Sequence, residues 1–166
     1  MAFKYSMEPS QSSISSVKLL PFSPEVLKKD KDLLKQLADL WLQLDATEAK
    51  YDEKFGLFFN EMPNPIEEFK KILLHHSGYY LRLDDKAIGF TVVMNSEYKN
   101  AYWLSTLIVD SKYRGMGLGR MLIEQIFDKK KPKRAILRVS MNNPAGLALY
   151  KKCGFEPISQ IMVKSK

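Results

Sequence analysis

Three glycines at alternate positions, Gly115, Gly117 and Gly119, follow an apolar run and open directly into a segment with helical periodicity. Because glycine has no side chain, an anion can approach the backbone of such a loop closely. The start of a helix also offers unpaired N–H groups and the positive end of the helix dipole. Arg114 stands just before the glycines and carries a forked donor that suits phosphate oxygens. The sequence therefore predicts a phosphate-binding turn at this loop.

The spacing of the glycines limits which phosphate ligand the loop can take. A loop for nucleoside triphosphates ends in Gly-Lys-Ser or Gly-Lys-Thr, whereas Gly119 is followed by Arg120 and Met121. A dinucleotide fingerprint reads Gly-x-Gly-x-x-Gly early in a βαβ unit, with an acidic residue about 20 residues later. Here the pattern is Gly-x-Gly-x-Gly and lies in the second half of the chain. Neither nucleotide interpretation fits.

A different phosphate-binding family does fit. The form Arg-x-x-Gly-x-Gly, met by Arg114, Gly117 and Gly119, resembles the acyl-CoA-binding motif of the GNAT superfamily of N-acetyltransferases. Residues 137–155 resemble a second signature of that superfamily, a strand, an Asn and a helix that ends in Leu-Tyr-x-Lys-x-Gly-Phe. In that signature Asn143 stands seven residues before Tyr150, and Gly146 replaces the usual Ala. The resemblance covers residues 79–166 closely and residues 17–76 loosely.

This resemblance implies an α+β fold: a mixed, mostly antiparallel, twisted sheet, splayed at the cofactor site and flanked by about four helices. It implies acetyl-CoA as co-substrate, with the backbone amides and carbonyls of Ile108 and Val109 pairing with its pantetheine arm as with an added strand. The residues that the resemblance assigns to cofactor binding are Leu107, Ile108, Val109, Arg114, Gly115, Met116, Gly117, Leu118, Gly119, Arg120, Asn143 and Tyr150.

Tyr150 is the candidate catalytic residue. Its motif position implies that its hydroxyl protonates the leaving thiolate of coenzyme A, since a phenol of pKa about 10 can donate to a thiolate whose conjugate acid has a pKa of about 8.5. Cys153 has no paired base nearby in sequence, so we interpret it as a small buried hydrophobe rather than an acyl carrier. The general base stays open between Glu97 and a water chain through Ser105 or Thr106, because the strand before the glycines has no carboxylate.

The function that the resemblance implies is that of an acyltransferase. It would pass an acetyl group to a primary amine of a small molecule or peptide by direct attack in a ternary complex. The alternative is a non-catalytic module on the same fold that senses acyl-CoA or binds nucleic acid, and the missing strand carboxylate favours it. Carboxylates and aromatics interleave over residues 45–59, which suits a cationic acceptor and equally an ordinary solvated loop. The identity of the amine and a homodimeric state are left open.

Composition describes an ordinary globular domain. The chain has 166 residues, of which 45% are hydrophobic and 27% charged, and a net charge of +7. That charge suits coenzyme A and would also attract nucleic acid, which is the less favoured partner. We expect a loose segment over residues 1–15 and one N-acetyltransferase domain over residues 16–166. Without a bilayer-length apolar run, a secretory signal or a second cysteine, the sequence predicts a cytoplasmic protein with no metal and no membrane partner.

Periodicity predicts the elements that position these residues. We expect a strand over residues 17–22, then a helix over 24–44 that can divide at the charged residues 28–32, and an irregular stretch over 45–64. A helix over residues 65–76, with His75 and His76 in its last turn, would end at Gly78. Strands over 79–83, 86–95 and 101–109 are joined by tight turns. After the glycine-loop helix come a strand over 134–140, a helix over 144–153 and a closing strand pair over 155–164.

Overall fold

The computed structural model describes residues 16–51 and 64–159. Within them one sheet has five strands in the order β1-β2-β3-β4-β5. The strands are β1 (Lys18–Phe22), β2 (Ser77–Leu83), β3 (Lys86–Asn95), β4 (Ala101–Val109) and β5 (Arg134–Ile136). The first four pair antiparallel with their neighbours, and β5 pairs parallel with β4. The predicted mixed, mostly antiparallel sheet is therefore confirmed.

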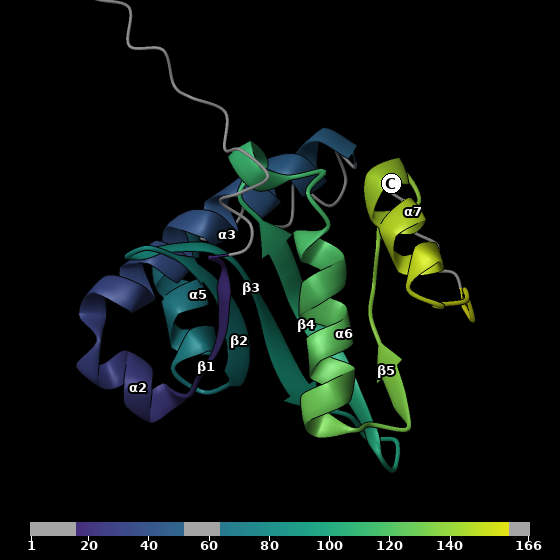
Figure 1. Ribbon diagram of the computed structural model, residues 1–166, viewed down its shortest axis with the longest axis horizontal. Coiled ribbons are helices and arrows are strands. Elements are labelled where there is room, and N and C mark those ends of the chain that lie inside the picture. Colours follow the sequence, from purple (N-terminus) through teal and green to yellow (C-terminus); the bar gives the residue numbers. More distant parts are fainter. Residues whose placement is uncertain (1–15, 52–63, 160–166) are drawn as a thin grey trace, which may run out of the picture.

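Helices cover both faces of this sheet (Figure 1). One face carries α2 (Pro24–Lys29), α3 (Lys31–Tyr51) and α5 (Pro65–Leu73), whose buried apolar residues pack with Phe90, Val92 and Ile108. The other face carries α6 (Leu118–Lys130), which packs on Leu81, Ile88, Val93, Leu104 and Val109. The last helix, α7 (Pro144–Lys152), lies beyond β5 (Figure 1). Neighbouring β4 residues thus point into two different cores, which fixes the strand from both sides.

The starts of α2, α5 and α7 follow one sequence pattern, a polar cap followed by proline. Ser23, Asn64 and Asn143 precede Pro24, Pro65 and Pro144, and each cap side chain accepts a hydrogen bond from an N–H of the first turn. The division predicted at residues 28–32 is confirmed. Asp30 ends α2, and its Oδ1 accepts from the Leu33 N–H at 2.9 Å to start α3.

Five predictions about where elements begin, end or occur are wrong. Helix α3 continues to Tyr51 instead of ending near residue 44, and α5 ends at Leu73, so that His75 lies in the following turn. Gly78 lies within β2 rather than capping a helix, because a Cβ there would collide with the Thr91 carbonyl of β3. Strand β5 stops at Ile136 instead of residue 140, and residues 155–159 form no strand. The rest of the predicted closing pair lies outside the described residues.

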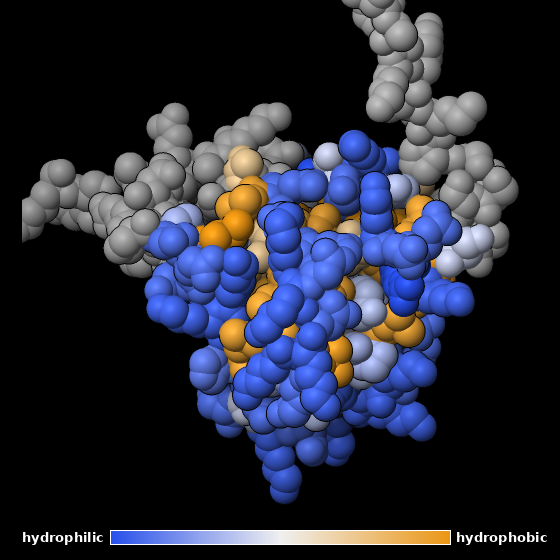
Figure 2. All heavy atoms as spheres, turned by 90° about the vertical axis from the view of Figure 1, so that its left-hand side faces the viewer, coloured by the Kyte–Doolittle hydropathy of each residue, from blue (hydrophilic) through white to orange (hydrophobic). Residues whose placement is uncertain are grey.

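The face formed by α2, α3 and α5 is mostly hydrophilic, with hydrophobic side chains confined to small areas (Figure 2). The large hydrophobic side chains exposed on these helices are Val26, Leu42 and Ile72. Scattered apolar residues of this kind are normal on a protein surface.

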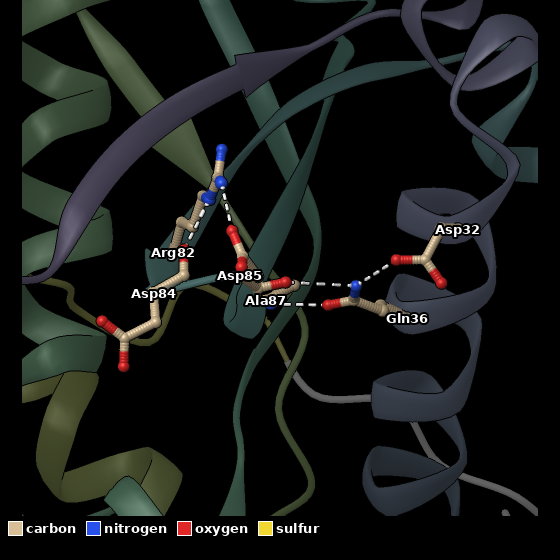
Figure 3. A network of polar contacts seen from close by, with 6 residues as sticks. All are labelled: Asp32, Gln36, Arg82, Asp84, Asp85 and Ala87. Carbon is tan, nitrogen blue, oxygen red and sulfur yellow. Dashed lines mark hydrogen bonds and ion pairs between the residues drawn. The ribbon is translucent and has the colours of Figure 1, made fainter.

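A polar network ties α3 to the β2–β3 turn (Figure 3). Gln36 Oε1 accepts from the Ala87 N–H at 2.7 Å, and Gln36 Nε2 donates to Asp32 at 2.7 Å and to the Asp85 carbonyl at 3.4 Å. Across the turn, Arg82 bonds the Asp84 carbonyl and the Asp85 carboxylate, both at 2.7 Å. One amide side chain thus satisfies backbone groups 49 and 51 residues further along the chain.

We expect Gln36→Ala to lower the free energy of unfolding by about 1–2 kcal/mol, because the half-buried Ala87 N–H loses its partner. Urea denaturation monitored by circular dichroism measures this. Lys35→Ala, on the same helix, removes an exposed ion pair with Asp39 and serves as the control, with little change expected. Equal effects of the two variants would contradict the role given to Gln36.

Candidate active site

Half of β4 has an open hydrogen-bonding edge. Strand β5 pairs only with Ala101, Tyr102 and Trp103, so from Leu104 to Val109 no described strand lies on that side. Figure 1 shows the chain leaving the sheet after β5 and continuing to α7. The two strands therefore diverge as the resemblance predicted, and a row of backbone groups is left facing the gap.

The backbone direction along β4 identifies which residues face the gap. Asp110 donates its N–H to the Ile88 carbonyl at 2.9 Å, and the Ile108 carbonyl oxygen lies 2.8 Å from an ideal Cβ on Gly89. Both groups thus point toward β3. Because strand groups alternate in direction, Leu107 and Val109 present their N–H and C=O to the open edge. Of the two backbones expected to pair with the cofactor arm, Ile108 is engaged inside the sheet and Val109 is not.

A β-bulge marks the point where β4 and β5 separate. The register places Val92 opposite Thr106 and Val93 opposite Leu104, which leaves Ser105 without a partner. Ser105 is exposed and lies two residues after Trp103, the last residue paired with β5. A bulge increases local twist and bends its strand. The irregularity at Ser105 therefore contributes to the divergence of the two strands.

At the other end of the open edge, the glycine loop leads into α6. Gly115 and Gly117 have φ of 80° and 78°, a left-handed conformation, and a Cβ on either would meet nothing within 4 Å. Gly117 is the N-cap of α6 and makes no side-chain capping bond, so no cap side chain occupies the first N–H groups of the helix. Gly119 differs, because its Cβ would lie 3.0 Å from Leu149 of α7. Two glycines shape the loop, and the third lets the two helices approach.

Two side chains fasten the loop to the body of the protein. Arg114 Nε donates to the Val109 carbonyl at 2.9 Å, which brings its guanidinium to the end of the open edge. Gln43 of α3 accepts from the Ser111 N–H at 3.1 Å, at the start of the connection from β4 to the loop. Sequence reasoning missed Gln43, because its partner is 68 residues away and no local pattern signals such a contact.

Helix α7 brings Tyr150 toward the same strand. Asn143 Oδ1 caps the helix by accepting from the Gly146 N–H at 2.9 Å. A Cβ on Gly146 would lie 3.0 Å from the Asn143 amide, a close contact with a side chain. Tyr150 packs with Phe155, ring centroids 5.8 Å apart, and lies against the cluster that contains Leu104. The predicted acid thus belongs to the same packed group as the residue preceding the bulge.

The comparisons with known proteins agree with this geometry. Residues 38–155 match the Acetyltransferase (GNAT) family. The chain belongs to this family of acyltransferases. It is 28% identical over 106 residues to N-alpha-acetyltransferase RimI of Mycobacterium tuberculosis, covering 61% of the present chain and 67% of RimI. It is 30% identical over 125 residues to the uncharacterized N-acetyltransferase YobR of Bacillus subtilis, covering 74% of the chain and 46% of YobR. A 30% identical protein of Mycobacterium leprae, ML0378, is matched over 31% of its own length and 66% of this chain.

Solved structures share the GNAT fold at low sequence identity. An aminoglycoside acetyltransferase from an uncultured soil metagenomic sample, in complex with sisomicin, has a TM-score of 0.62 at 16% identity, covering 92% of this chain and 99% of that one. The aminoglycoside N-acetyltransferase AAC(6')-Iy, in complex with CoA, has a TM-score of 0.62 at 16% identity, covering 90% and 94%. A Pyrococcus furiosus protein reaches 0.66 at 17% identity, covering 90% and 99%. At these identities the likeness supports the fold.

The side chains that could accept a proton in this GNAT protein differ in position and environment. Glu97 lies on the turn before β4, where hydrogen bonds from its own backbone N–H and from Trp103 Nε1, at 3.1 Å, lower the pKa of its carboxyl. That direction makes Glu97 a weaker proton acceptor. His75 and His76 line a groove of about 500 Å³ together with Tyr102, at the end of β4 remote from the glycine loop. Ser105 lies directly at the bulge, and Thr106 is buried.

The predicted acceptor segment is described only in part. Residues 45–51 belong to α3, and residues 52–63 lie outside the described residues. The assignment of the acceptor to residues 45–59 stays a prediction. Within residues 16–51 and 64–159, no helix is long and apolar enough to cross a membrane, and no three His, Cys, Asp or Glu side chains form a metal-binding group.

Burial raises the pKa of the Cys153 thiol above its ordinary value, with a smaller opposing effect from Arg120. The thiol therefore stays protonated near pH 7, and the protonated form is the unreactive one. We expect slow labelling by iodoacetamide in the native protein and fast labelling in urea, as followed by mass spectrometry. Native labelling as fast as that of free cysteine at pH 7 would contradict the assignment of Cys153 as a packing residue.

Proposed function

We propose that this protein is an acetyl-CoA-dependent N-acetyltransferase that acts on a primary amine of a small molecule or peptide. The observation that carries the proposal is the uncapped start of α6 beside the unpaired half of β4. A phosphate-binding helix start and an exposed strand edge, joined by one short loop, match what a phosphate-bearing, peptide-like ligand requires. Acetyl transfer is the function that the family and this geometry support best.

The residues of the loop fit coenzyme A. Open space above Gly115 and Gly117 admits an anion to the backbone, and a side chain at either position would occupy that space. In this proposal the first N–H groups of α6, over residues 118–120, bind the pyrophosphate together with Arg114. Leu107 and Val109 offer backbone groups to the amide-bearing arm, and Asn143 borders it from α7. Met116 lies between Gly115 and Gly117 and is part of the same loop.

When bound, acetyl-CoA supplies the acetyl group as an activated thioester. The protein's own contribution is to orient the reactants and move protons. The phenolic hydroxyl of Tyr150 serves as the acid that protonates the departing sulfur, supported by the packing of α7 against the cluster of Leu104. The acceptor amine, after its ammonium form loses a proton to a water chain through Ser105 or Thr106, attacks the acetyl carbonyl directly in a ternary complex, and the new C–N bond replaces the C–S bond to coenzyme A. Because burial keeps the thiol of Cys153 protonated, an acyl-cysteine route has no support.

Replacement of Gly117 by Val tests the phosphate cradle. We expect loss of measurable acetyl-CoA binding by calorimetry, because the new side chain occupies the space above the loop. Gly154→Val is the matched control: Gly154 also has a left-handed φ, of 83°, and open space around it, but lies after α7. Both variants should lose similar stability, of the order of 1–2 kcal/mol. An unaltered affinity in Gly117→Val would reject the cradle.

Replacement of Tyr150 by Phe tests the acid. The ring and its contact with Phe155 are kept, so we expect kcat to fall by about 10²-fold or more, with little change in acetyl-CoA affinity. Tyr79→Phe removes a hydroxyl from the same hydrophobic cluster and is the control. A kcat equal in the two variants would remove Tyr150 from the reaction. Acetyl-CoA binding without thiol release on any amine would favour the non-catalytic module.

A further inference from the structure

A charged and aromatic cluster stands where the gap between β4 and β5 closes. Trp103 is the last residue of β4 that pairs with β5, opposite Ile136. Arg138, two residues beyond Ile136 on the departing chain, lies over the Trp103 ring with its Cζ 5.4 Å from the centroid. The bulge residue Ser105 follows Trp103 by two positions. The cluster therefore borders the inner end of the open edge, about 20 Å along the strand from Val109.

Arg138 is exposed and lies over the Trp103 ring, and no residue that the structure describes accepts a hydrogen bond from its guanidinium. Among residues 16–51 and 64–159, no carboxylate forms an ion pair with Arg138, and no hydrogen bond fixes its guanidinium. Stacking on an indole holds a guanidinium plane in place and leaves its N–H fork free to bind a carboxylate with two hydrogen bonds. Arg138 is therefore placed to bind an anion at the point where β4 and β5 begin to separate.

Glu97 places the opposite charge on the same tryptophan. Its Oε2 accepts from Trp103 Nε1 at 3.1 Å, so the carboxylate lies at the ring edge while Arg138 covers the ring face. The backbone N–H of Glu97 and this hydrogen bond from Trp103 both lower the pKa of the Glu97 carboxyl, which favours its ionised form. One rigid ring thus separates a fixed cation from a fixed anion. A ligand with both an ammonium and a carboxylate group matches this arrangement.

We propose that Trp103, Arg138 and Glu97 form the acceptor site, and that the acceptor carries a carboxylate close to its amine, as in an amino acid or a peptide with an acidic N-terminal residue. This inference rests on the proposed acetyl transfer. Arg138 binds the carboxylate, and Glu97 attracts the ammonium before it loses its proton. The net charge of +7 acts in the same direction, because it attracts acceptors that carry negative charge and repels polycations.

Matched acceptors test the site. Thiol release is measured with amino acids and their amides, with peptides that begin in Glu or Gln, and with polyamines and aminoglycosides. We expect KM values about tenfold or more lower for the carboxylate-bearing member of each pair. If only free amino acids show a lower KM than their amides, the natural acceptor is a small molecule. If the KM values differ only between the Glu and Gln peptides, the natural acceptor is a peptide.

Two arginine variants assign the preference to a residue. Arg138→Gln should raise KM for carboxylate acceptors about tenfold, leave KM for the amides and for acetyl-CoA unchanged, and be partly rescued by Arg138→Lys. Arg134→Gln removes the same charge four residues earlier on β5, where Arg134 is also exposed, and is the control. If the two variants raised KM equally, the loss of one positive charge would explain the effect without a specific role for Arg138, and the proposal would be overturned.

A binding measurement separates this inference from the function on which it rests. Calorimetry with the same acceptors on CoA-saturated protein reports the site without turnover. Carboxylate-dependent binding that Arg138→Gln abolishes would support the site even if no thiol were released, in which case the proposed catalysis alone fails. Turnover or binding that favours amides, polyamines or aminoglycosides over carboxylate acceptors would overturn the inference and leave the proposed transferase intact.

Discussion

The unpaired half of β4 is the constraint on which the rest of the structure depends. Backbone N–H and C=O groups inside a sheet normally have partners, and a strand edge left open is a site for another strand to bind. In this protein β4 bonds β3 along its length but meets β5 over three residues. The backbone groups of Leu107 and Val109 therefore point toward a gap that no described strand fills. The helix start at one end and the cluster of Trp103 at the other set its limits.

An open edge is useful only if its strand cannot shift to close the gap. The side chains of β4 prevent such a shift because they enter separate cores on the two faces. Ile108 packs among the residues of α3 and α5, whereas Leu104 and Val109 pack against α6. Sliding by one residue would exchange these faces and expose the apolar set to water. Burial on both sides thus holds the edge rigid without any contact on the edge itself.

How much the sequence predicts depends on the range of the interactions. The Ser23-Pro24 and Asn143-Pro144 caps, the alternation in β3 and β4, and the glycine loop are local signals, and they placed these elements correctly. The end of α3 and the length of β5 were wrong, since helix continuation and strand pairing depend on packing elsewhere in the chain. Gly78 was misread for the same reason, because its requirement comes from the neighbouring carbonyl of Thr91.

In the candidate site, too, local features can be predicted from sequence, whereas features that depend on distant parts of the chain cannot. The glycine spacing and the capping Asn143 were readable from sequence, as was the position of Tyr150. The outward direction of Leu107, the bulge at Ser105 and the stacking of Arg138 on Trp103 were not. Each of these depends on strand register, and a single sequence carries no record of register.

The environment of the titratable groups favours catalysis by positioning over catalysis by a strong base. Hydrogen bonds lower the pKa of Glu97, which makes it a fixed negative charge rather than a proton acceptor. Burial raises the pKa of Cys153, which keeps it neutral and unreactive. An amine held beside an activated acyl group needs mainly alignment, since orientation of two bound reactants supplies a large part of the rate enhancement. A rigid strand edge, a fixed helix start and a charged cluster are the parts that alignment requires, and they are the parts that this fold places along one strand.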